Sequence, residues 1–513
     1  MSEISKKTPT KMTADYMLKV KPQKASRRSD TGEQKRAANE FIRDRDRILG
    51  SKAFRRLAGK AQVFITGVDD HMRTRLTHTL EVSQIARTIA VPLKLDLELV
   101  EAIALGHDLG HTPYGHVGER TLHEIMTPQQ NHVLGKRCPM NMDDPATFDY
   151  SAFADLQGFK HNLQSLVVAM KLERNYTGYG MDLTNFTHYG MMAHSRSTYS
   201  KKRIRNHDAL GYYKAFLDEG CTADGGNAWS LESLLVAEAD EIAQYCHDVE
   251  DALFGGLITP GEIKKIMTDH FGDFGIFPEL PPAEAELLER PENYDLGEFV
   301  ALISRCLVNM LVNRTLLVAS YHIDRIGREY RLSVREYQDF RRDHRPDDDL
   351  FGMIFSYSYT PEERAQKDGF ARRVGDFQDT IVQRVLSSYD IQKADAKGRY
   401  IITKLFQAYY ETPQQLPDRC VYELLSTYHD LAVGAYEGKV NAEDNYWKYT
   451  EAQLRDDART KGIGFVRQRF TRLYANRENT LPIEEMLLMR TICNHIAGMT
   501  DTYAHKVYEE LYG

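Results

Sequence analysis

The stretch from His107 to Glu119, HDLGHTPYGHVGE, constrains this chain most strongly, because it places three histidines and two acids within 13 residues. His107 and His111 stand four apart, so a helix would carry both on one face. The preceding run LELVEAIALG repeats apolar residues with helical spacing on that face. The helix is therefore expected to aim its imidazoles inward, where a neutral imidazole is a metal ligand or a proton carrier.

Glycine and proline follow these residues and are expected to end the helix. Gly110, Pro113 and Gly115 would turn His116 and Glu119 back toward the same neighbourhood. A lone histidine on an apolar face is usually a hydrogen-bonded core residue. Several histidines with two acids at this density instead indicate a functional site.

A second histidine-bearing helix is predicted near residues 73–91, in RTRLTHTLEVSQIARTIA. His78, Val82, Ile85 and Ile89 step by four, three and four, so His78 is expected on the buried face, and Pro92 is expected to close the helix. The distance to His107 allows one turn and an antiparallel return. A two-helix hairpin would set His78 against the His107–Asp108 pair.

Two further residues suit an anionic ligand, and each also has a plainer interpretation. Arg75 lies about one turn before His78 and could meet an anion there, or could form a surface salt bridge. His161 stands near the start of a helix in GFKHNLQSL. A helix start favours anions, although His161 could equally cap that helix.

A long helix is predicted from Trp229 to Phe254, with an apolar stripe that includes Leu235 and Ile242. Asp240 lies on the opposite face, in the row that also contains Gln244, His247 and Asp251, with Asp248 beside it. That face could simply be solvated. His78, His107 and Asp108, however, leave a metal short of protein ligands, and Asp240 would complete the set.

Two histidines and two aspartates make a mixed nitrogen and oxygen site, which suits a divalent ion with open positions for water and substrate. We expect Mg²⁺ or Mn²⁺ at this site before other ions, with Fe, Co and Zn as alternatives. Such an ion activates water and polarises a phosphoryl oxygen. The remaining histidines and Glu119 could transfer protons, so the set suits phosphoester hydrolysis.

Composition excludes several other classes of protein. The formal net charge of −8 does not indicate a general nucleic-acid binder. Six scattered cysteines without a CxxC pair are typical of reduced thiols in a cytoplasmic protein. The polar, basic N-terminus has no apolar core of a signal peptide. The apolar run 299–323 is interrupted by polar residues, so we interpret it as a buried amphipathic helix and expect no membrane association.

Three regions are predicted along the chain. Residues 1–36 form a basic N-terminal arm, 37–265 the catalytic helical core, and 266–513 a helical region that packs on that core. A loop-rich insertion is expected at 127–158. A basic loop near residue 200, within SKKRIRNH, is either solvated or in contact with a nucleotide or nucleic acid.

The motifs together resemble one family closely. FRRLAGKAQVF, RTRLTHTLEV, HDLGHTPYGHVGE, GFKHNLQSL, ADEIAQYCHDVEDAL and IAGMTDTYA are similar to motifs of the bacterial deoxyguanosinetriphosphate triphosphohydrolases within the HD superfamily of metal-dependent phosphohydrolases. They cover roughly residues 50–255 and a C-terminal patch. The resemblance implies an all-α fold and hydrolysis of dGTP, or of other dNTPs, to deoxynucleoside and inorganic triphosphate.

The same resemblance assigns roles to individual residues. It implies a metal held by His78, His107, Asp108 and Asp240. It implies catalytic roles for His111, His116, Glu119 and His161, with His116 as proton donor to the leaving oxygen and Glu119 orienting it. It implies substrate contacts from Gln62, Arg75, Gln244 and Asp248, with Arg75 and His161 on phosphate oxygens and Asp248 at the 3′-hydroxyl.

Gln244 departs from the family pattern, because many relatives carry a tyrosine there, and this bears on nucleotide preference. The resemblance further implies a homo-oligomer, tetrameric or hexameric, with a dNTP activator and single-stranded nucleic acid as further possible partners. Two other functions stay open at this point. One is an HD phosphodiesterase acting on a signalling nucleotide, and the other is a nucleic-acid-binding protein or nuclease.

Overall fold

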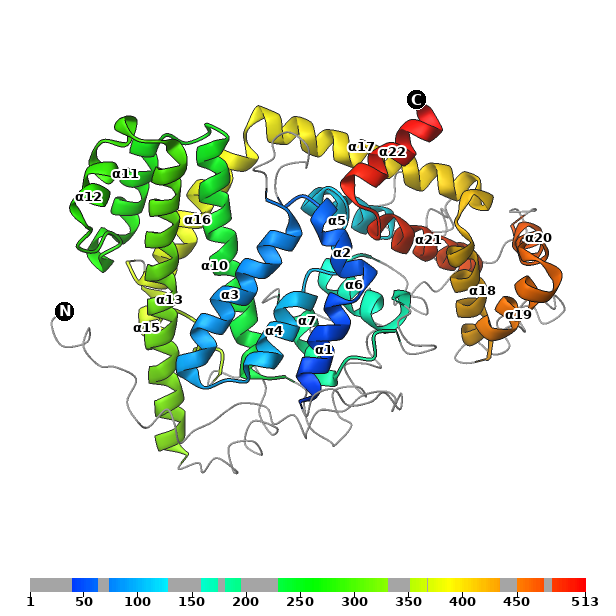
Figure 1. The fold of residues 1–513 in the computed structure, drawn as a ribbon, viewed down its shortest axis with the longest axis horizontal. Coiled ribbons are helices and arrows are strands. Elements are labelled where there is room, and N and C mark those ends of the chain that lie inside the picture. Colours follow the sequence, from blue (N-terminus) through cyan, green and yellow to red (C-terminus); the bar gives the residue numbers. More distant parts are fainter. Residues whose placement is uncertain are drawn as a thin grey trace.

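The protein is helical throughout the part that the computed structural model describes, namely residues 39–62, 73–127, 158–173, 180–194, 229–330, 351–366, 368–433, 450–474 and 482–513. Within those residues no extended strand is formed, and Ala61 and Thr74 make an isolated antiparallel bridge. The predicted all-α fold is therefore confirmed (Figure 1). The arm at 1–36, the basic loop near residue 200 and nearly all of the insertion at 127–158 lie outside the described residues.

The centre of the molecule is built by helices from the first half of the chain (Figure 1). These are α1 (Glu40–Leu49), α2 (Lys52–Arg56), α3 (Arg75–Leu93), α4 (Leu97–Gly106), α5 (Gly115–Ile125), α6 (His161–Val167), α7 (Asn185–Ala193) and α10 (Leu231–Phe254), with short 3₁₀ and π segments at Leu57–Gly59 and Val168–Leu172. Helix α10 packs against both α3 and α4, which also pack on each other. The predicted pairing of the two histidine-bearing helices is thus confirmed.

Side-chain caps define where the three central helices begin. Thr74 and Ser230 each form a capping box at the starts of α3 and α10. The carboxylate of Asp96 accepts the amides of Glu98 and Leu99 at the start of α4. Such caps satisfy amides that the first helical turn leaves unpaired. The apolar stripe predicted for α10 is buried along its length, with Leu235, Ile242 and the other stripe residues almost without exposed surface.

Two predicted helix ends are wrong. Pro92 does not close α3, which includes it and ends at Leu93, where Lys94 takes a left-handed conformation. Helix α4 ends at Gly106 and not after His111, so His107 is its C-cap and His111 lies beyond it. The helix stops early because backbone bonds between Leu109 and Gly106 and between His111 and Asp108 fold the chain into turns. His107 and His111 therefore do not share a helical face.

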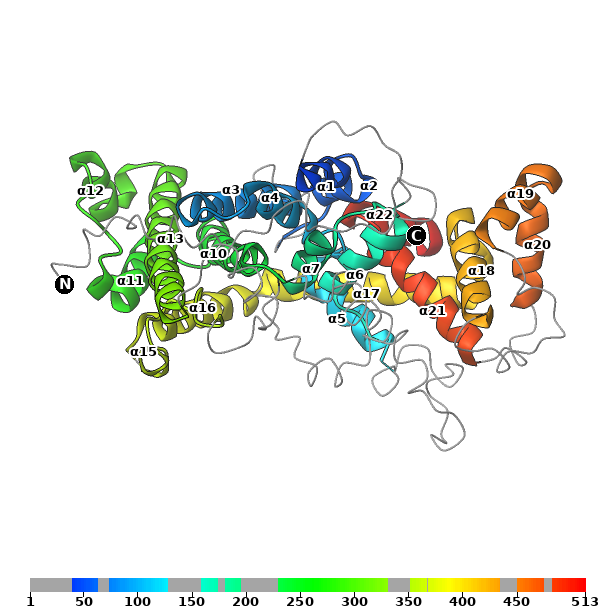
Figure 2. The same cartoon turned by 90° about the horizontal axis from the view of Figure 1, so that it is seen from below.

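The second half of the chain flanks this centre at both ends (Figures 1 and 2). At one end lie α11 (Pro260–Phe271), α12 (Pro282–Glu289), α13 (Leu296–Glu329), α15 (Pro361–Ala365) and α16 (Phe370–Leu386). Helices α11, α12, α13 and α16 share a hydrophobic core with α3, α4 and α10, and α15 packs against α16. At the other end lie α17 (Tyr389–Glu411), α18 (Asp418–Val433), α19 (Glu451–Lys461), α20 (Ile463–Leu473), α21 (Pro482–Ala497) and α22 (Asp501–Tyr512). Their core includes Leu122 and Ile125 of α5. The predicted division at residue 265 falls inside α11.

Helix α13 is long and apolar enough to cross a bilayer by length and composition, and half of its most apolar window is buried inside the protein. It packs against α10 and α3. Buried core helices of proteins can have the same length and apolar composition as helices that cross a membrane.

Candidate metal and phosphate site

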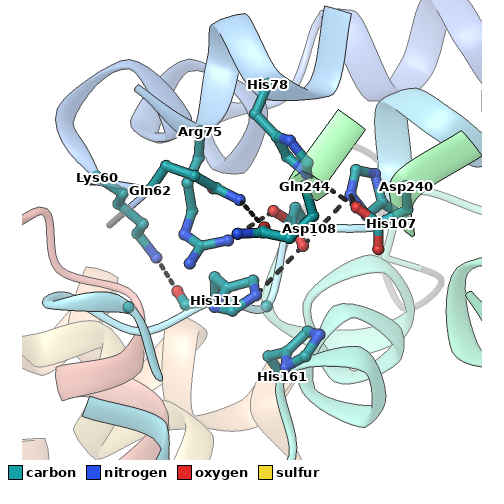
Figure 3. A network of polar contacts seen from close by, with 12 residues as sticks. Lys60, Gln62, Arg75, His78, His107, Asp108, His111, His161, Asp240 and Gln244 are labelled. Carbon is teal, nitrogen blue, oxygen red and sulfur yellow. Dashed lines mark hydrogen bonds and ion pairs between the residues drawn. The ribbon is translucent and has the colours of Figure 1, made fainter. Parts of the chain in front are cut away.

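Three side chains from three helices converge at the centre of the molecule (Figure 3). His78 of α3, His107 at the end of α4 and Asp240 of α10 place ligand atoms within 4.8 Å of one another. The Oδ1 atom of Asp240 lies 3.0 Å from Nε2 of His78 and 3.7 Å from Nε2 of His107. Asp240 keeps 24% of its side-chain surface exposed, so the group opens to solvent on that side.

The histidine tautomers suit a metal ligand set. The Nδ1–H of His107 donates to the carbonyl oxygen of Ala104 at 2.6 Å, which leaves Nε2 as a lone-pair atom. That Nε2 is buried and has no hydrogen-bond partner in the described part of the chain. A buried polar atom without a partner is costly unless something binds it. Imidazole nitrogen and carboxylate oxygen are both ligands of divalent cations, so the donor atoms of these residues suit a metal site.

Asp108 lies between this triad and a second group. Its Oδ1 is 3.4 Å from Nε2 of His107 and 3.3 Å from Nε2 of His111, while its Oδ2 accepts a hydrogen bond of 2.7 Å from Arg75. Asp108, His111 and His161 also place ligand atoms within 4.8 Å of one another. The predicted fourth ligand is therefore positioned to serve either group.

The neighbouring basic groups hold both aspartates in the ionised form. Burial alone would raise the pKa of Asp240, but the contact with His78 and the nearby His107 outweigh burial and lower it. Burial is likewise outweighed at Asp108, where His111, His107 and Arg75 hold the pKa well below its usual range. Ionised carboxylates are the form that binds a cation.

A chain of hydrogen bonds supports His78 from behind. Its Nδ1 lies 3.3 Å from Nδ1 of His247, and Nε2 of His247 contacts the carboxylate of Glu81. If Nε2 of His78 carries the free lone pair, its Nδ1–H donates to His247, whose Nε2–H donates to Glu81. Burial, with help from His78 and Arg73 and against Glu81, lowers the pKa of His247 to about 4, so His247 is neutral as this chain requires.

The second group consists mainly of stacked imidazoles. The rings of His111 and His161 stack at 3.9 Å with 17° between their planes. The Nδ1 atom of His161 contacts the carboxylate of Glu119, and Lys160 donates to the same carboxylate at 3.1 Å. Burial first, and then Arg75, holds the pKa of His111 well below its usual range, so His111 is uncharged near neutral pH.

His116 is exposed on the first turn of α5, after Tyr114 in the left-handed conformation. Desolvation by the surrounding protein, and then Arg75 and His161, lower the pKa of His116 to about 4. Among the described residues Glu119 hydrogen-bonds His161 and Lys160, not His116. An orienting role for Glu119 therefore has a structural basis at His161.

The residues predicted to contact the sugar form a hydrogen-bonded row. The Nε2 of Gln62 donates to Oε1 of Gln244 at 2.9 Å, and Nε2 of Gln244 donates to Oδ1 of Asp248 at 2.7 Å. Burial raises the pKa of Asp248 to about 7, partly offset by the hydrogen bond from Gln244. Figure 3 shows Gln62 and Gln244 directly beside Arg75 and Asp108.

Two buried residues that the sequence did not single out fix the backbone around the site. Lys60 donates to the carbonyl oxygens of His111 and Ala497. The carboxylate of Asp501 accepts the amide of Ala61 at 2.9 Å and the amide of Tyr114 at 3.0 Å. Lys60 and Asp501 lie within motifs that carry the family resemblance, which is the signal that could have identified them.

His194 is a third residue that the sequence did not reveal. It follows α7, and its Nε2 lies 3.2 Å from Nε2 of His161 while its ring packs edge-on to His107. It therefore joins the two groups. Gly110 permits this crowding, because a Cβ there would lie 2.2 Å from the carbonyl oxygen of His161. No local pattern in the sequence marked His194.

Two family models and several known proteins match this chain. A family model described as the HD domain matches residues 75–135, and one described as a phosphohydrolase-associated domain matches residues 365–429. The deoxyguanosinetriphosphate triphosphohydrolase-like protein of Ralstonia pickettii is 33% identical over 379 residues, which cover 74% of this chain and 79% of that protein. The chain belongs to the deoxyguanosinetriphosphate triphosphohydrolase-like family.

Other members match over different lengths. The family protein of Rhizobium johnstonii is 28% identical over 92% of this chain and 89% of its own length. That of Ralstonia nicotianae is 42% identical over 44% of this chain and 49% of its own length. As a family member with an HD domain and a fitting ligand set, the protein is a metal-dependent phosphohydrolase. Asp240, Gln244 and Asp248 lie outside both matched segments, so α10 supplies its part of the site from elsewhere in the chain.

Proposed function

We propose that the protein hydrolyses deoxynucleoside triphosphates, dGTP among them, to deoxynucleoside and inorganic triphosphate. The observation that carries this proposal is the arrangement along α10. Asp240, Gln244 and Asp248 recur every four residues, so they lie on one side of the helix and span about 12 Å along its axis. Asp240 belongs to the metal triad and Asp248 ends the hydrogen-bonded row, which suits a nucleotide with its phosphates at one end and its sugar at the other.

Arg75 is prepared to bind a phosphate. One guanidinium nitrogen, Nη1, is held by Asp108, while Nε and Nη2 are buried without a partner among the residues described. A phosphate oxygen would satisfy these donors in the geometry that a guanidinium favours. His161 lies beyond His111 in the same cluster, with Lys160 beside it. We therefore assign the triphosphate to the space that Arg75 and His161 border.

His78, His107, Asp108 and Asp240 would hold the divalent ion, with Mg²⁺ or Mn²⁺ first and Fe, Co or Zn as alternatives. When bound, the ion would lower the pKa of a water molecule and neutralise charge on a phosphoryl oxygen. The tautomer of His107 that Ala104 selects keeps the ligand nitrogen directed into the site.

His116 is assigned the proton that the leaving oxygen needs. In the protein alone it is neutral near pH 7, because its pKa is about 4. Burial is the main cause of that low value and Arg75 the next, and a bound triphosphate would neutralise the charge of Arg75. The pKa of His116 would then rise toward the range in which a general acid works. His111 remains in the stack, and Glu119 fixes His161.

Gln62, Gln244 and Asp248 are assigned to the sugar. The Oε1 of Gln62 is buried without a partner, so it can accept a hydrogen bond from the ligand. Asp248 would accept one from the 3′-hydroxyl. Gln244 replaces the tyrosine of many relatives, so we expect recognition of this part of the sugar to rest on hydrogen bonds and not on ring packing.

Product analysis tests the proposal. Purified protein is incubated with each dNTP and Mg²⁺ or Mn²⁺, and the products are separated by anion exchange. We expect inorganic triphosphate and deoxynucleoside, and neither with the Asp240→Ala variant. Pyrophosphate with a nucleoside monophosphate would contradict the proposed reaction. Turnover of a cyclic dinucleotide or of single-stranded DNA, with none of any dNTP, would favour the phosphodiesterase or the nuclease instead.

We also propose, from the scattered cysteines, that the protein is cytoplasmic and, from the family resemblance, that it forms a tetramer or hexamer. Measuring rates with dNTPs singly and in pairs would show whether one dNTP activates hydrolysis of another. Sedimentation of the purified protein would give the oligomer size, and a monomer at working concentration would contradict the assembly.

A further inference from the structure

A cavity lies apart from the metal and phosphate site, between α2 and the C-terminal helices. Its volume is about 400 Å³, and its lining includes Arg56, Arg419, His495, Met499 and Tyr503. None of the residues assigned above to metal, phosphate or sugar lines it. We call it the cation-lined cavity, because its charged lining consists of two arginines.

His495 faces this cavity without any polar partner. Its side chain is almost completely buried, with 5% of the residue exposed, and neither ring nitrogen has a hydrogen-bond partner among the residues that the structure describes. Its ring packs edge-on to Tyr409 at 5.1 Å, which holds it in place without satisfying a nitrogen. Two buried nitrogens in one ring that the described residues leave unpaired point to a ligand in the cavity.

Nearby carboxylates balance the positive charge of Arg56 and Arg419 only in part. Burial and the nearby Arg419 lower the pKa of Arg56, and Glu173, 3.4 Å away, compensates only in part. Arg419 forms no ion pair within the described part of the chain, and its neighbour Asp418 is bound instead to Arg467. Asp501, next to the lining, is occupied by two backbone amides. The charged side chains that line the cavity are therefore both positive, and Glu173 is the carboxylate that the described residues place beside Arg56.

We propose that the cation-lined cavity binds the phosphate group of a small phosphorylated compound. A phosphate dianion would neutralise both guanidiniums, whose planar donors match phosphate oxygens. His495 would then donate a third hydrogen bond. The cavity also adjoins the start of α22, where the helix dipole favours an anion. Its volume exceeds that of phosphate alone, so the organic part would lie against Met499 and Tyr503.

The experiment uses inorganic phosphate as the probe, in the full chain and with a metal chelator present. Arg75→Gln first removes the phosphate donor of the HD site. Binding that remains in this background is measured by titration calorimetry against chloride at equal ionic strength. Adding Arg419→Gln should weaken it about tenfold or more, since a hydrogen bond to a charged group is worth about 1.5–3 kcal/mol. Arg459→Gln, an exposed arginine on α19, is the matched control and should leave it unchanged.

The melting temperature without phosphate supplies a second readout. Arg419→Gln should melt at or above the wild type, because it relieves repulsion with Arg56, yet it should lose the stabilisation that phosphate gives. A general weakening of the fold would lower the melting temperature both without and with phosphate. His495→Gln provides an independent loss of binding if Arg419→Gln fails to fold. Complete loss of phosphate binding in Arg75→Gln alone, or equal affinity with and without Arg419, would overturn the proposal.

Discussion

Replacing Asp248 by asparagine should stabilise the protein, and the gain should grow with pH. Asp248 is buried, with 6% of the residue exposed, and burial raises its pKa from the ordinary 3.8 to about 7. Ionising it in the folded state is therefore costly. An asparagine side chain would keep the shape and could still accept the hydrogen bond from Gln244. The substitution therefore removes the negative charge and keeps the shape of the side chain and its hydrogen bond with Gln244.

The sign follows from proton binding in the two states. Below pH 4 the folded and unfolded chains both hold the proton, so burial of Asp248 costs nothing electrostatically. Between pH 4 and 7 the unfolded chain releases the proton while the folded chain keeps it, so stability falls as pH rises. With these pKa values the cost is about 2 kcal/mol at pH 5 and about 4 kcal/mol at pH 8.

Thermal unfolding at pH 5 and pH 8, with a metal chelator present, measures this difference. A change of 1 kcal/mol moves the midpoint by about 2–4 °C in chains of 150–250 residues and by less in longer ones. We therefore expect Asp248→Asn to raise the midpoint by several degrees at pH 8 and by less at pH 5. Asp379→Asn, at an exposed site on α16, is the control and should show no such trend. A gain that is equal at both pH values would refute the reasoning.

Other changes should separate the roles of the site residues. Asp240→Ala should abolish metal binding, since the ligand set has few members to spare; metal content close to wild type in the purified variant would contradict this. His116→Ala should retain the metal but lose about 10²–10⁴-fold in kcat, the usual contribution of a proton donor; loss of metal instead would make His116 a ligand. His247→Phe should weaken metal affinity about 10–100-fold in a chelator competition, because His78 loses the acceptor that selects its tautomer; unchanged affinity would show that the contact is only packing. Finally, 2′,3′-dideoxynucleotides should be poor substrates unless Asp248 is removed, and equal kcat/KM for a dNTP and its dideoxy analogue would exclude the 3′-hydroxyl contact.

Helical spacing predicted the parts of this site that depend on a single helix. Asp240 was placed opposite the buried stripe of α10, and His78 was placed on the buried face of α3, because a period of 3.6 residues determines which side chains share a face. The turn after Gly106 was missed for a related reason. The spacing of His107 and His111 is equally compatible with a helix and with a chain that turns back, and only the bonds at Leu109 and His111 distinguish them.

Contacts between distant segments could not be predicted in this way. His194 reaches His161 and His107 because α7 packs against α4 and α6, and no residue near His194 in the sequence records that packing. The hydrogen-bond partners of Glu119 could not be predicted from the sequence either. Its predicted neighbour His116 is close in sequence, but His161 and Lys160 come from a segment about 40 residues away and reach the Glu119 carboxylate through the fold.

The two hydrogen bonds that the Asp501 carboxylate accepts from backbone amides have a consequence for the order in which parts of the protein fold during synthesis. The bond from Ala61 joins residues that are 440 positions apart, and the bond from Tyr114 spans 387. Contacts this distant form late, since the entropy of closing such long loops must be overcome first. On a ribosome, the metal ligands and the histidine stack would all have emerged long before residue 501. The backbone beside Gln62 and His116 would still lack its anchor, so a nascent chain could hold the ion before it could position a nucleotide.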